Sequence, residues 1–201
     1  ASPVACANPI GRAWNGTIGI PYPSTELSIR DGGFNELPPW TGAGDIEKHT
    51  GEICVRGPQV MKGYWNNAAE TSKVMQDGWL KTGDIGHMDA TGQFTITDRK
   101  KDMILVSGFN VYPSEIESVI MTLPGVLECG VVGVPDAKTG EAVKAVVVRK
   151  DPALTKEAVI AHCKAHLTGY KLPRTVEFRD ALPKTPIGKV LRRELRDAPT
   201  P

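Results

Sequence analysis

The chain has 201 residues, of which 40% are apolar and 23% charged, as is typical of a globular protein rather than a disordered one. The net charge of +1 gives no overall basic field for nucleic acid, so a nucleic-acid-binding module is disfavoured. The apolar runs are short, so no segment is predicted to span a bilayer, and the first residues do not resemble a signal peptide.

The first half of the sequence predicts short strands separated by turns. Sequences typical of turns, such as Asp31-Gly32-Gly33 and Gly57-Pro58, lie between the expected strands. Strands are expected over residues 25–30, 51–56, 78–82 and 93–97, and a short helix over 67–76. Many short strands with Gly and Pro between them predict a small antiparallel barrel or sandwich.

The second half alternates strands and helices. Strands are expected over residues 103–106, 126–134, 142–149 and 175–178, and helices over 114–123, 155–167 and 189–196. Ser114 and Glu117 have the spacing of a capping box, and Thr155 is the expected N-cap of the second helix. This order predicts a small sheet with helices packed on it, and hence an α+β fold.

A run of five charged residues, Asp98-Arg99-Lys100-Lys101-Asp102, lies between two apolar strand candidates. Its composition alone favours a solvated turn. A linker between two mobile domains is the alternative, and it would divide the chain into residues 1–100 and 101–201. The fold class expected overall is α+β, with a β-barrel-like first part followed by a small α+β domain.

Three segments carry a resemblance to a known family. They read GWLKTGDI at 78–85, DRKKDMI running on through SGFNVYP to EIE at 98–117, and PKTPIGKV at 183–190. In this order and spacing they resemble the adenylate-forming enzymes, which include acyl-CoA synthetases, firefly luciferase and the adenylation domains of peptide synthetases. The segments at 100–113, 167–173 and 188–195 are most similar to bacterial long-chain fatty-acid–CoA ligases.

The resemblance implies a function and a domain organisation. Residues 1–100 would be the last, β-barrel-like subdomain of the large adenylating domain, and residues 101–201 its C-terminal α+β lid domain. The implied reaction uses Mg²⁺, ATP and CoA to convert a fatty acid first to acyl-AMP and then to acyl-CoA, releasing pyrophosphate and AMP. The family's Ser/Thr/Gly-rich phosphate loop has no counterpart in this sequence, so we expect a fragment that is inactive alone.

The resemblance assigns Lys189 as the catalytic lysine of adenylation. Lys189 follows Gly188, and a flexible stem with a point charge suits a group that reaches into a site from a lid. Asp84 and Arg99 would contact the ribose of the nucleotide, since a carboxylate accepts hydrogen bonds from a vicinal diol and a guanidinium donates to oxygen. Taken alone, the three residues also fit an exposed lysine, a turn aspartate and an arginine in a charged turn.

The same resemblance places a hinge at Lys101. Rotation there would exchange the face of the lid that meets the active site. The second face would present the segment 105–110, in which Ser107 and Gly108 line a channel for the pantetheine of CoA. A side chain in place of Gly108 would narrow that channel; a turn glycine that needs positive φ is the other explanation, and the two are compatible.

No metal site is expected. The four cysteines form no CxxC pair, and His162 and His166, four residues apart, have no evident third ligand. The expected partners are a fatty acid, ATP and CoA, in the cytoplasm, with peripheral membrane contact compatible with a lipid substrate and the oligomeric state left open. The alternatives are an adenylating enzyme for another carboxylic acid and a non-catalytic lid or interaction module.

Overall fold

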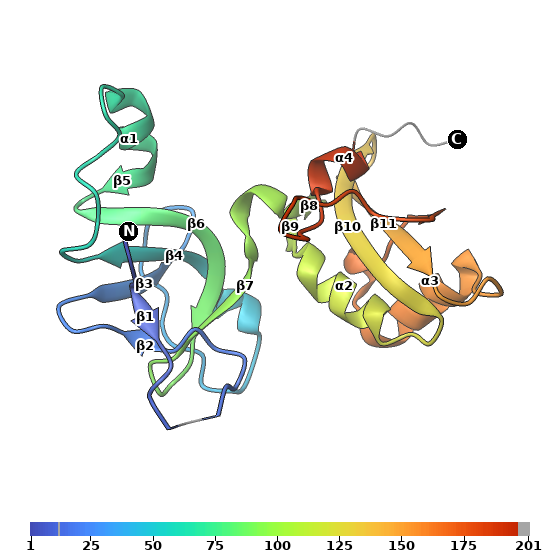
Figure 1. The fold of residues 1–201 in the computed structure, drawn as a ribbon, viewed down its shortest axis with the longest axis horizontal. Helices are drawn as coiled ribbons and strands as arrows, with labels where there is room; N and C mark the ends of the chain where they lie inside the picture. The colour runs from blue at the N-terminus through green and yellow to red at the C-terminus, as the bar shows by residue number, and fades with distance from the viewer. Residues whose placement is uncertain (12, 197–201) are drawn as a thin grey trace. The chain divides into compact units, whose positions relative to one another are not determined.

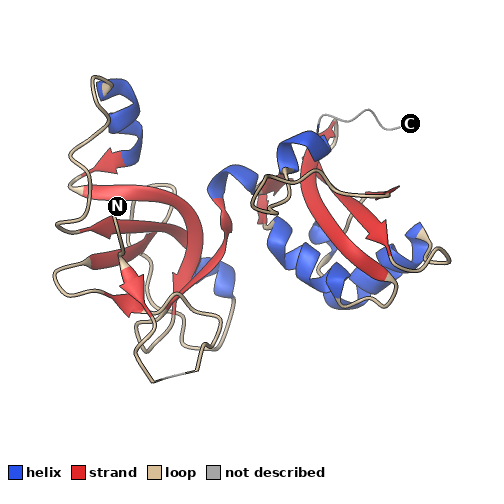
Figure 2. Ribbon diagram, viewed as in Figure 1, coloured by secondary structure: helices blue, strands red, loops and turns tan. Residues whose placement is uncertain are grey.

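The chain folds as two compact units, Ala1–Lys101 and Asp102–Pro201, shown in a computed structural model that describes residues 1–11 and 13–196 (Figure 1). We call them the first and the second unit. Strands dominate the first unit, whereas the second combines strands with helices (Figure 2). The α+β class expected from the sequence is confirmed. None of the described helices is long and apolar enough to cross a bilayer.

The first unit contains an antiparallel sheet of five strands. Its path runs β3-β4-β6-β5, with β7 paired to β6, and the strands are β3 (Glu26–Arg30), β4 (Gly51–Arg56), β5 (Met75–Gln76), β6 (Trp79–Met88) and β7 (Phe94–Arg99). A small second sheet pairs β1 (Cys6–Ala7) with β2 (Ile20–Pro21), and η1 (Ile46–His49) and α1 (Ala68–Val74) lie in the connections. Within the described residues the five-stranded sheet stays open and does not close into a barrel.

Local interactions of the first unit explain its turns. Asn67 caps α1, because its side chain accepts a hydrogen bond from the Glu70 N–H. The Asp89 carboxylate accepts from the N–H groups of Thr91 and Gln93, which fixes the turn between β6 and β7. Ile29, Ile53 and Phe94 form the buried centre of this unit.

The second unit contains another five-stranded sheet. Its path runs β10-β11-β8-β9, and β12 pairs with β11 in parallel. In chain order after η2 (Lys100–Asp102), its elements are β8 (Ile104–Val106), β9 (Phe109–Val111), α2 (Pro113–Met121), β10 (Val126–Asp136), β11 (Gly140–Arg149), α3 (Lys156–His166), η3 (Gly169–Lys171), β12 (Thr175–Arg179) and α4 (Arg192–Arg196).

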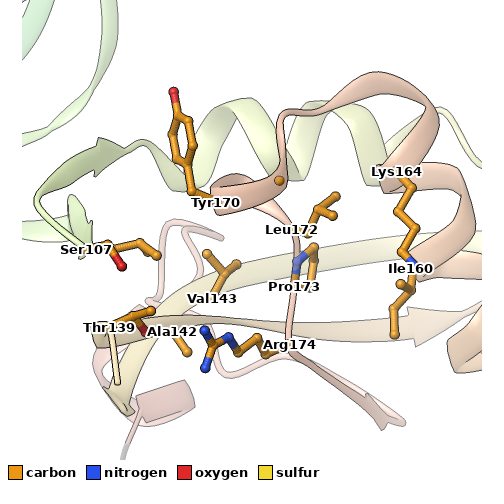
Figure 3. Close-up of a pocket in the computed structure, with 12 residues that line it drawn as sticks. Ser107, Thr139, Ala142, Val143, Ile160, Lys164, Tyr170, Leu172, Pro173 and Arg174 are labelled. Atoms are coloured by element: carbon orange, nitrogen blue, oxygen red, sulfur yellow. The ribbon is translucent and has the colours of Figure 1, made fainter. Parts of the chain in front are cut away.

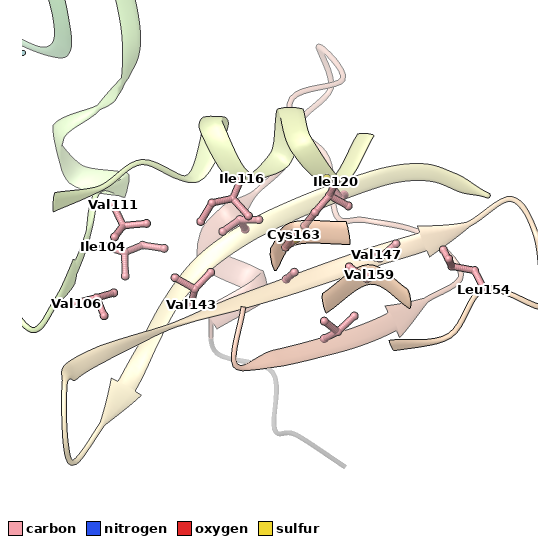
Figure 4. Packing of buried hydrophobic residues seen from close by; sticks show 14 residues of the cluster. Ile104, Val106, Val111, Ile116, Ile120, Val143, Val147, Leu154, Val159 and Cys163 are labelled. Carbon is pink, nitrogen blue, oxygen red and sulfur yellow. The ribbon is translucent and has the colours of Figure 1, made fainter. Parts of the chain in front are cut away.

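Strand β11 is buried on both faces. Val143, Ala145 and Val147 join the larger core, in which α2 and α3 contribute Ile116, Ile120, Val159 and Cys163 (Figure 4). The alternate residues Val146 and Val148 pack with Leu182, Val190 and Leu195 of the C-terminal segment. Because side chains alternate across a strand, these two clusters lie on opposite sides of the sheet. We call them the helix side and the tail side.

Three sequence expectations need correction in the second unit. α2 begins with Pro113 rather than in a capping box, because Tyr112 is its N-cap and makes no side-chain cap hydrogen bond. A proline suits that first position, since its missing N–H would have no helical partner there. The last helix begins at Arg192, not at residue 189. Residues 109–111, for which no strand was expected, form β9.

Candidate functional site

Lys189 lies on a short hairpin formed by residues 183–191, which we call the lysine hairpin. The Leu191 N–H donates to the Pro183 carbonyl and the Thr185 N–H to the Lys189 carbonyl, each at 2.8 Å. Gly188 closes the tip in the left-handed conformation, with φ of 81°. The Lys189 side chain is exposed, and no ion pair of it is seen within residues 1–11 and 13–196. A hydrogen-bonded turn therefore presents the exposed Lys189 ammonium to solvent.

The two ends of the lysine hairpin are anchored on the tail side of the sheet. Leu182 and Leu195 are buried there, and Val190 packs beside them. Lys144, which is only 2% exposed, reaches the Leu195 carbonyl at 3.4 Å while it pairs with Glu177 at 2.7 Å. Apolar burial and a buried cation thus fix the segment on both sides of Lys189.

The structure brings Asp84 and Arg99 together. They are directly opposite each other on β6 and β7, and the Arg99 Nε lies 2.7 Å from the Asp84 Oδ1. Asp84 is half-buried and Arg99 is exposed. The pair stands beside an apolar hollow of about 600 Å³ whose lining includes Leu80, Thr82 and Asp84 itself. A carboxylate and a guanidinium beside a hollow provide the acceptors and donors that hydroxyl groups need.

A buried glutamate that sequence reasoning missed supports this pair. Glu52 on β4 accepts a hydrogen bond from the Gly83 N–H at 3.0 Å with its Oε1, and its Oε2 pairs with Lys100 at 2.7 Å. Gly83 immediately precedes Asp84, and Lys100 immediately follows Arg99. One carboxylate therefore contacts the residue next to each member of the pair, the backbone of Gly83 and the side chain of Lys100.

Lys101 lies in the middle of the single 3-10 turn η2 and is exposed. Its neighbours are fixed within their own units. Lys100 pairs with Glu52 of the first unit, and Asp102 pairs with Arg192 of the second at 3.3 Å. The backbone at Lys101 thus connects two anchored residues, a suitable position for a pivot.

Ser107 and Gly108 form the two-residue turn between β8 and β9. Both have positive φ, 51° for Ser107 and 86° for Gly108, as a type I′ hairpin turn requires. A Cβ on Gly108 would meet no atom within 4 Å, so its backbone faces open space. The Ser107 N–H donates to the Thr139 carbonyl at 2.8 Å, which ties the turn to the connection between β10 and β11.

A hollow of about 450 Å³ lies next to Ser107 (Figure 3). It is lined by Val143 and Ile160, which are on the helix side of the sheet, and by Tyr170. Lys164 and Arg174 also line it, and Arg174 pairs with Asp136 at 2.7 Å. The hollow beside the Ser107–Gly108 turn is therefore on the helix side, whereas the lysine hairpin is anchored on the tail side.

The predicted residues are divided between the units. Asp84 and Arg99 lie in the first unit, and Ser107, Gly108 and Lys189 lie in the second. Within the described part of the chain, no group of three or more His, Cys, Asp or Glu side chains is arranged to hold a metal ion.

Comparison with known proteins identifies relatives over almost the whole chain. Residues 115–189 match the AMP-binding enzyme C-terminal domain, and residues 1–65 match the AMP-binding enzyme family. The sequence is 54% identical over 197 residues to a long-chain-fatty-acid–CoA ligase of Escherichia coli O6:H1, a match covering 98% of this chain and 34% of that relative. The corresponding ligase of Bacillus subtilis is 48% identical over 202 residues, 100% of this chain and 35% of its own length.

The fold is also similar to that of solved structures. ATP-bound MatB from Rhodopseudomonas palustris superposes with a TM-score of 0.86 at 39% identity, a match covering 96% of this chain and 38% of that one. The chain spans about a third of the length of the curated relatives it matches.

Proposed function

Because the chain belongs to the AMP-binding enzyme family, we propose that it is part of an ATP-dependent fatty-acid–CoA ligase. Residues 1–100 would complete the large adenylating domain, and residues 101–201 would be its lid. The observation that carries the proposal is the placement of two exposed features in the second unit: Lys189 on a hairpin anchored to the tail side, and the Ser107–Gly108 turn beside a hollow on the helix side.

In the first half-reaction, a carboxylate oxygen of the fatty acid attacks the α-phosphorus of ATP. The bond between the α-phosphorus and the bridging oxygen breaks, and pyrophosphate leaves with the electron pair. The attacking carboxylate and the nucleotide repel each other, and the Lys189 ammonium offsets that repulsion while it stabilises the charge on the α-phosphate. An ammonium with no ion-pair partner among the residues that the structure describes is suited to this role.

Asp84 and Arg99 hold the ribose of the nucleotide. Asp84 accepts hydrogen bonds from the hydroxyl groups and Arg99 donates to oxygen, and their 2.7 Å ion pair orients both side chains before the nucleotide arrives. Within the described residues no three His, Cys, Asp or Glu side chains are grouped to hold a metal ion, and Mg²⁺ would be held chiefly by the phosphates of ATP. The groups that bind the phosphates and the acyl chain would lie outside these 201 residues.

In the second half-reaction, the sulfur of CoA attacks the acyl carbon. The carbon–oxygen bond to AMP breaks, AMP leaves, and the thiol proton passes to solvent. Rotation at Lys101 would replace the lysine hairpin by the Ser107–Gly108 turn, whose open backbone leaves room for the pantetheine. Lys164 in the adjoining hollow supplies a cation for a phosphate of CoA.

The test uses the intact enzyme that contains this chain, as wild type and as Lys189→Ala. We expect palmitate-dependent exchange between ATP and pyrophosphate to fall by roughly 10²–10³-fold, because one preorganised electrostatic contact at a transition state is removed. Thioester formation from pre-made palmitoyl-AMP and CoA should survive. Lys156→Ala, which removes an exposed lysine at the start of α3, is the matched control and should leave both rates unchanged.

Three results would contradict the proposal in different ways. Retention of exchange in Lys189→Ala would remove the assigned role of the lysine. Equal loss of both half-reactions would contradict a lid with two faces. A wild-type enzyme that activates another carboxylic acid but not palmitate would keep the ligase reaction and exclude the fatty acid as its substrate.

A further inference from the structure

A cluster of charged residues beside the lysine hairpin has no part in the chemistry proposed so far. Its centre is Arg192, the first residue of α4 and the third residue after Lys189. The Arg192 side chain is 20% exposed and contacts carboxylates from two other segments, Glu117 on α2 and Asp102 next to the proposed hinge. These contacts connect the lysine hairpin, a core helix and the linker.

The contact between Arg192 and Glu117 has two points. The Arg192 Nη2 lies 2.7 Å from Glu117 Oε2, and its Nε lies 3.2 Å from Oε1. Glu117 Oε1 also accepts a hydrogen bond from the Val131 N–H at 2.8 Å. The carboxylate is therefore already fixed between α2 and β10, and a forked guanidinium bound to it has a defined orientation.

The same guanidinium reaches the linker. Its Nη1 lies 3.3 Å from Asp102 Oδ2, and Arg196, one turn further along α4, approaches Asp102 Oδ1 at 3.8 Å. Asp102 directly follows Lys101, the exposed residue at which we place the pivot. If Asp102 stays bound to α4 while the second unit rotates, the backbone bonds that turn must lie before Asp102.

We propose that Arg192 is a positioning residue for Lys189: it fixes the C-terminal end of the lysine hairpin to Glu117 and Asp102. The inference rests on the proposed function. Arg192 touches no reacting group, and it acts by holding the segment that carries the ammonium. Displacement of a catalytic group by about 1 Å can lower the reaction rate by two orders of magnitude. A residue that holds such a group in place can therefore affect the rate without touching the substrate.

If Arg192 has this role, its substitution should slow adenylation and spare thioester formation. The lysine hairpin serves adenylation, whereas thioester formation uses the Ser107–Gly108 turn on the other side of the sheet. In the intact enzyme, Arg192→Ala should lower ATP–pyrophosphate exchange at least tenfold and leave thioester formation from palmitoyl-AMP within about twofold. Arg192→Lys should be intermediate, since one ammonium cannot reproduce the two-point contact with Glu117 and also reach Asp102.

Arg193→Ala is the matched control, because it removes the same charge from an exposed position on the same helix. Hydrogen exchange on the 201-residue chain supplies a readout that does not depend on activity. In Arg192→Ala, the amides of Thr185, Gly188 and Lys189 should exchange faster, whereas those in the centre of β11 should not change. Arg193→Ala should leave both sets of amides as in the wild type.

The outcomes separate this inference from the proposed function. Unchanged hairpin amides in Arg192→Ala, or a parallel loss of both half-reactions, would overturn the role of Arg192 even if Lys189→Ala behaves as expected. If Lys189→Ala retains full exchange of ATP and pyrophosphate, the proposed function fails, and Arg192 has no catalytic lysine to position. Faster hairpin exchange together with selective loss of adenylation supports the inference.

Discussion

Glu52 is a buried side chain that holds the neighbours of the two residues proposed to bind the ribose, Asp84 and Arg99. Its Oε1 accepts a hydrogen bond from the Gly83 N–H, and its Oε2 forms an ion pair with Lys100. The residue is 9% exposed, so the Gly83 N–H would find little water if the carboxylate were removed. Displacement of Gly83 would move Asp84, the next residue along β6.

If the proposed function is correct, we predict that Glu52→Ala raises the KM for ATP in the intact enzyme by about tenfold, equivalent to ~1.4 kcal/mol. The KM for the fatty acid should change much less, because the two contacts of Glu52 are with the residues next to Asp84 and Arg99, which are proposed to hold the ribose. Glu52→Gln should restore much of the loss, since its amide oxygen still accepts from Gly83. Steady-state kinetics with each substrate varied in turn measures both constants.

The control for this prediction is Glu26→Ala on β3 of the same sheet. Glu26 also forms an ion pair, with Arg56 at 2.6 Å, but both side chains are largely exposed. Exposed pairs contribute little to stability. If Glu26→Ala raises the KM for ATP as much as Glu52→Ala does, the effect reflects the sheet in general and the role given to Glu52 is wrong.

Site residues could be predicted from the sequence where they lie in a short contiguous motif, and not where they act on a partner far away along the chain. Lys189 and Asp84 each lie within a contiguous motif, so the resemblance of those motifs to a known family made them candidates. Glu52 and Arg192 act on partners 31 and 75 residues away, at Gly83 and Glu117. Only the register of β4 against β6 and the packing of α4 bring those pairs together, and neither can be deduced from local patterns.

At the scale of elements, strands buried on both faces were the easiest to predict. β10 and β11 carry nearly continuous apolar runs, and both form close to the expected bounds. β9 was missed because Phe109 and Asn110 are exposed and only Val111 is buried, so the strand has no alternating pattern. α4 was placed too early because Lys189 and Val190 are helix-compatible residues that tertiary packing holds in a hairpin.

The connection between β10 and β11 gives a prediction about acid stability. Asp136 Oδ1 accepts from the Thr139 hydroxyl and from the N–H groups of Thr139 and Lys138, and its Oδ2 pairs with Arg174. The hydrogen bond from the Thr139 side chain, followed by those from the two backbone N–H groups, lowers the pKa of Asp136 from 3.8 to about 2. The Thr139 carbonyl in turn accepts from Ser107, so this connection also supports the Ser107–Gly108 turn.

Because the folded pKa of Asp136 lies below its unfolded value, the stabilisation is fully present above pH 3.8 and is lost as the pH falls toward 2. We expect Asp136→Asn to lower the Tm of the second unit at pH 5 and to reduce the fall in Tm between pH 4 and about 2. Thermal melts followed by far-UV circular dichroism measure both effects. Asp180→Asn, which removes an exposed carboxylate of this unit, should keep the wild-type slope, and an unchanged slope in Asp136→Asn would contradict the assignment.

At the scale of the whole molecule, each hydrophobic cluster draws its residues from one side of Lys101. The cluster of the first unit consists of Ile29, Ile53 and Phe94 with a few partly buried neighbours. The second unit has two clusters that cover both faces of its sheet. Since apolar burial is the main stabilising contribution to folding, we expect the first unit to be the less stable of the two.

The distribution of tryptophan makes this difference measurable. All four tryptophans, Trp14, Trp40, Trp65 and Trp79, lie in the first unit, so intrinsic tryptophan fluorescence reports on that unit alone. Trp79 is 7% exposed and contacts the guanidinium groups of Arg30 and Arg56, so unfolding will change its surroundings most. Calorimetry, by contrast, records the unfolding of both units.

We predict two calorimetric transitions for the 201-residue chain, with the fluorescence midpoint coinciding with the lower one. Ile120→Val, in the core of the second unit, should cost about 0.5–1.5 kcal/mol and lower only the upper transition. A change of 1 kcal/mol corresponds to a Tm shift of roughly 4–8 °C in a domain of this size. Ile53→Val should lower only the lower transition and the fluorescence midpoint with it. If Ile120→Val also moves the fluorescence midpoint, the two units unfold as one cooperative body, and Lys101 does not separate independent domains.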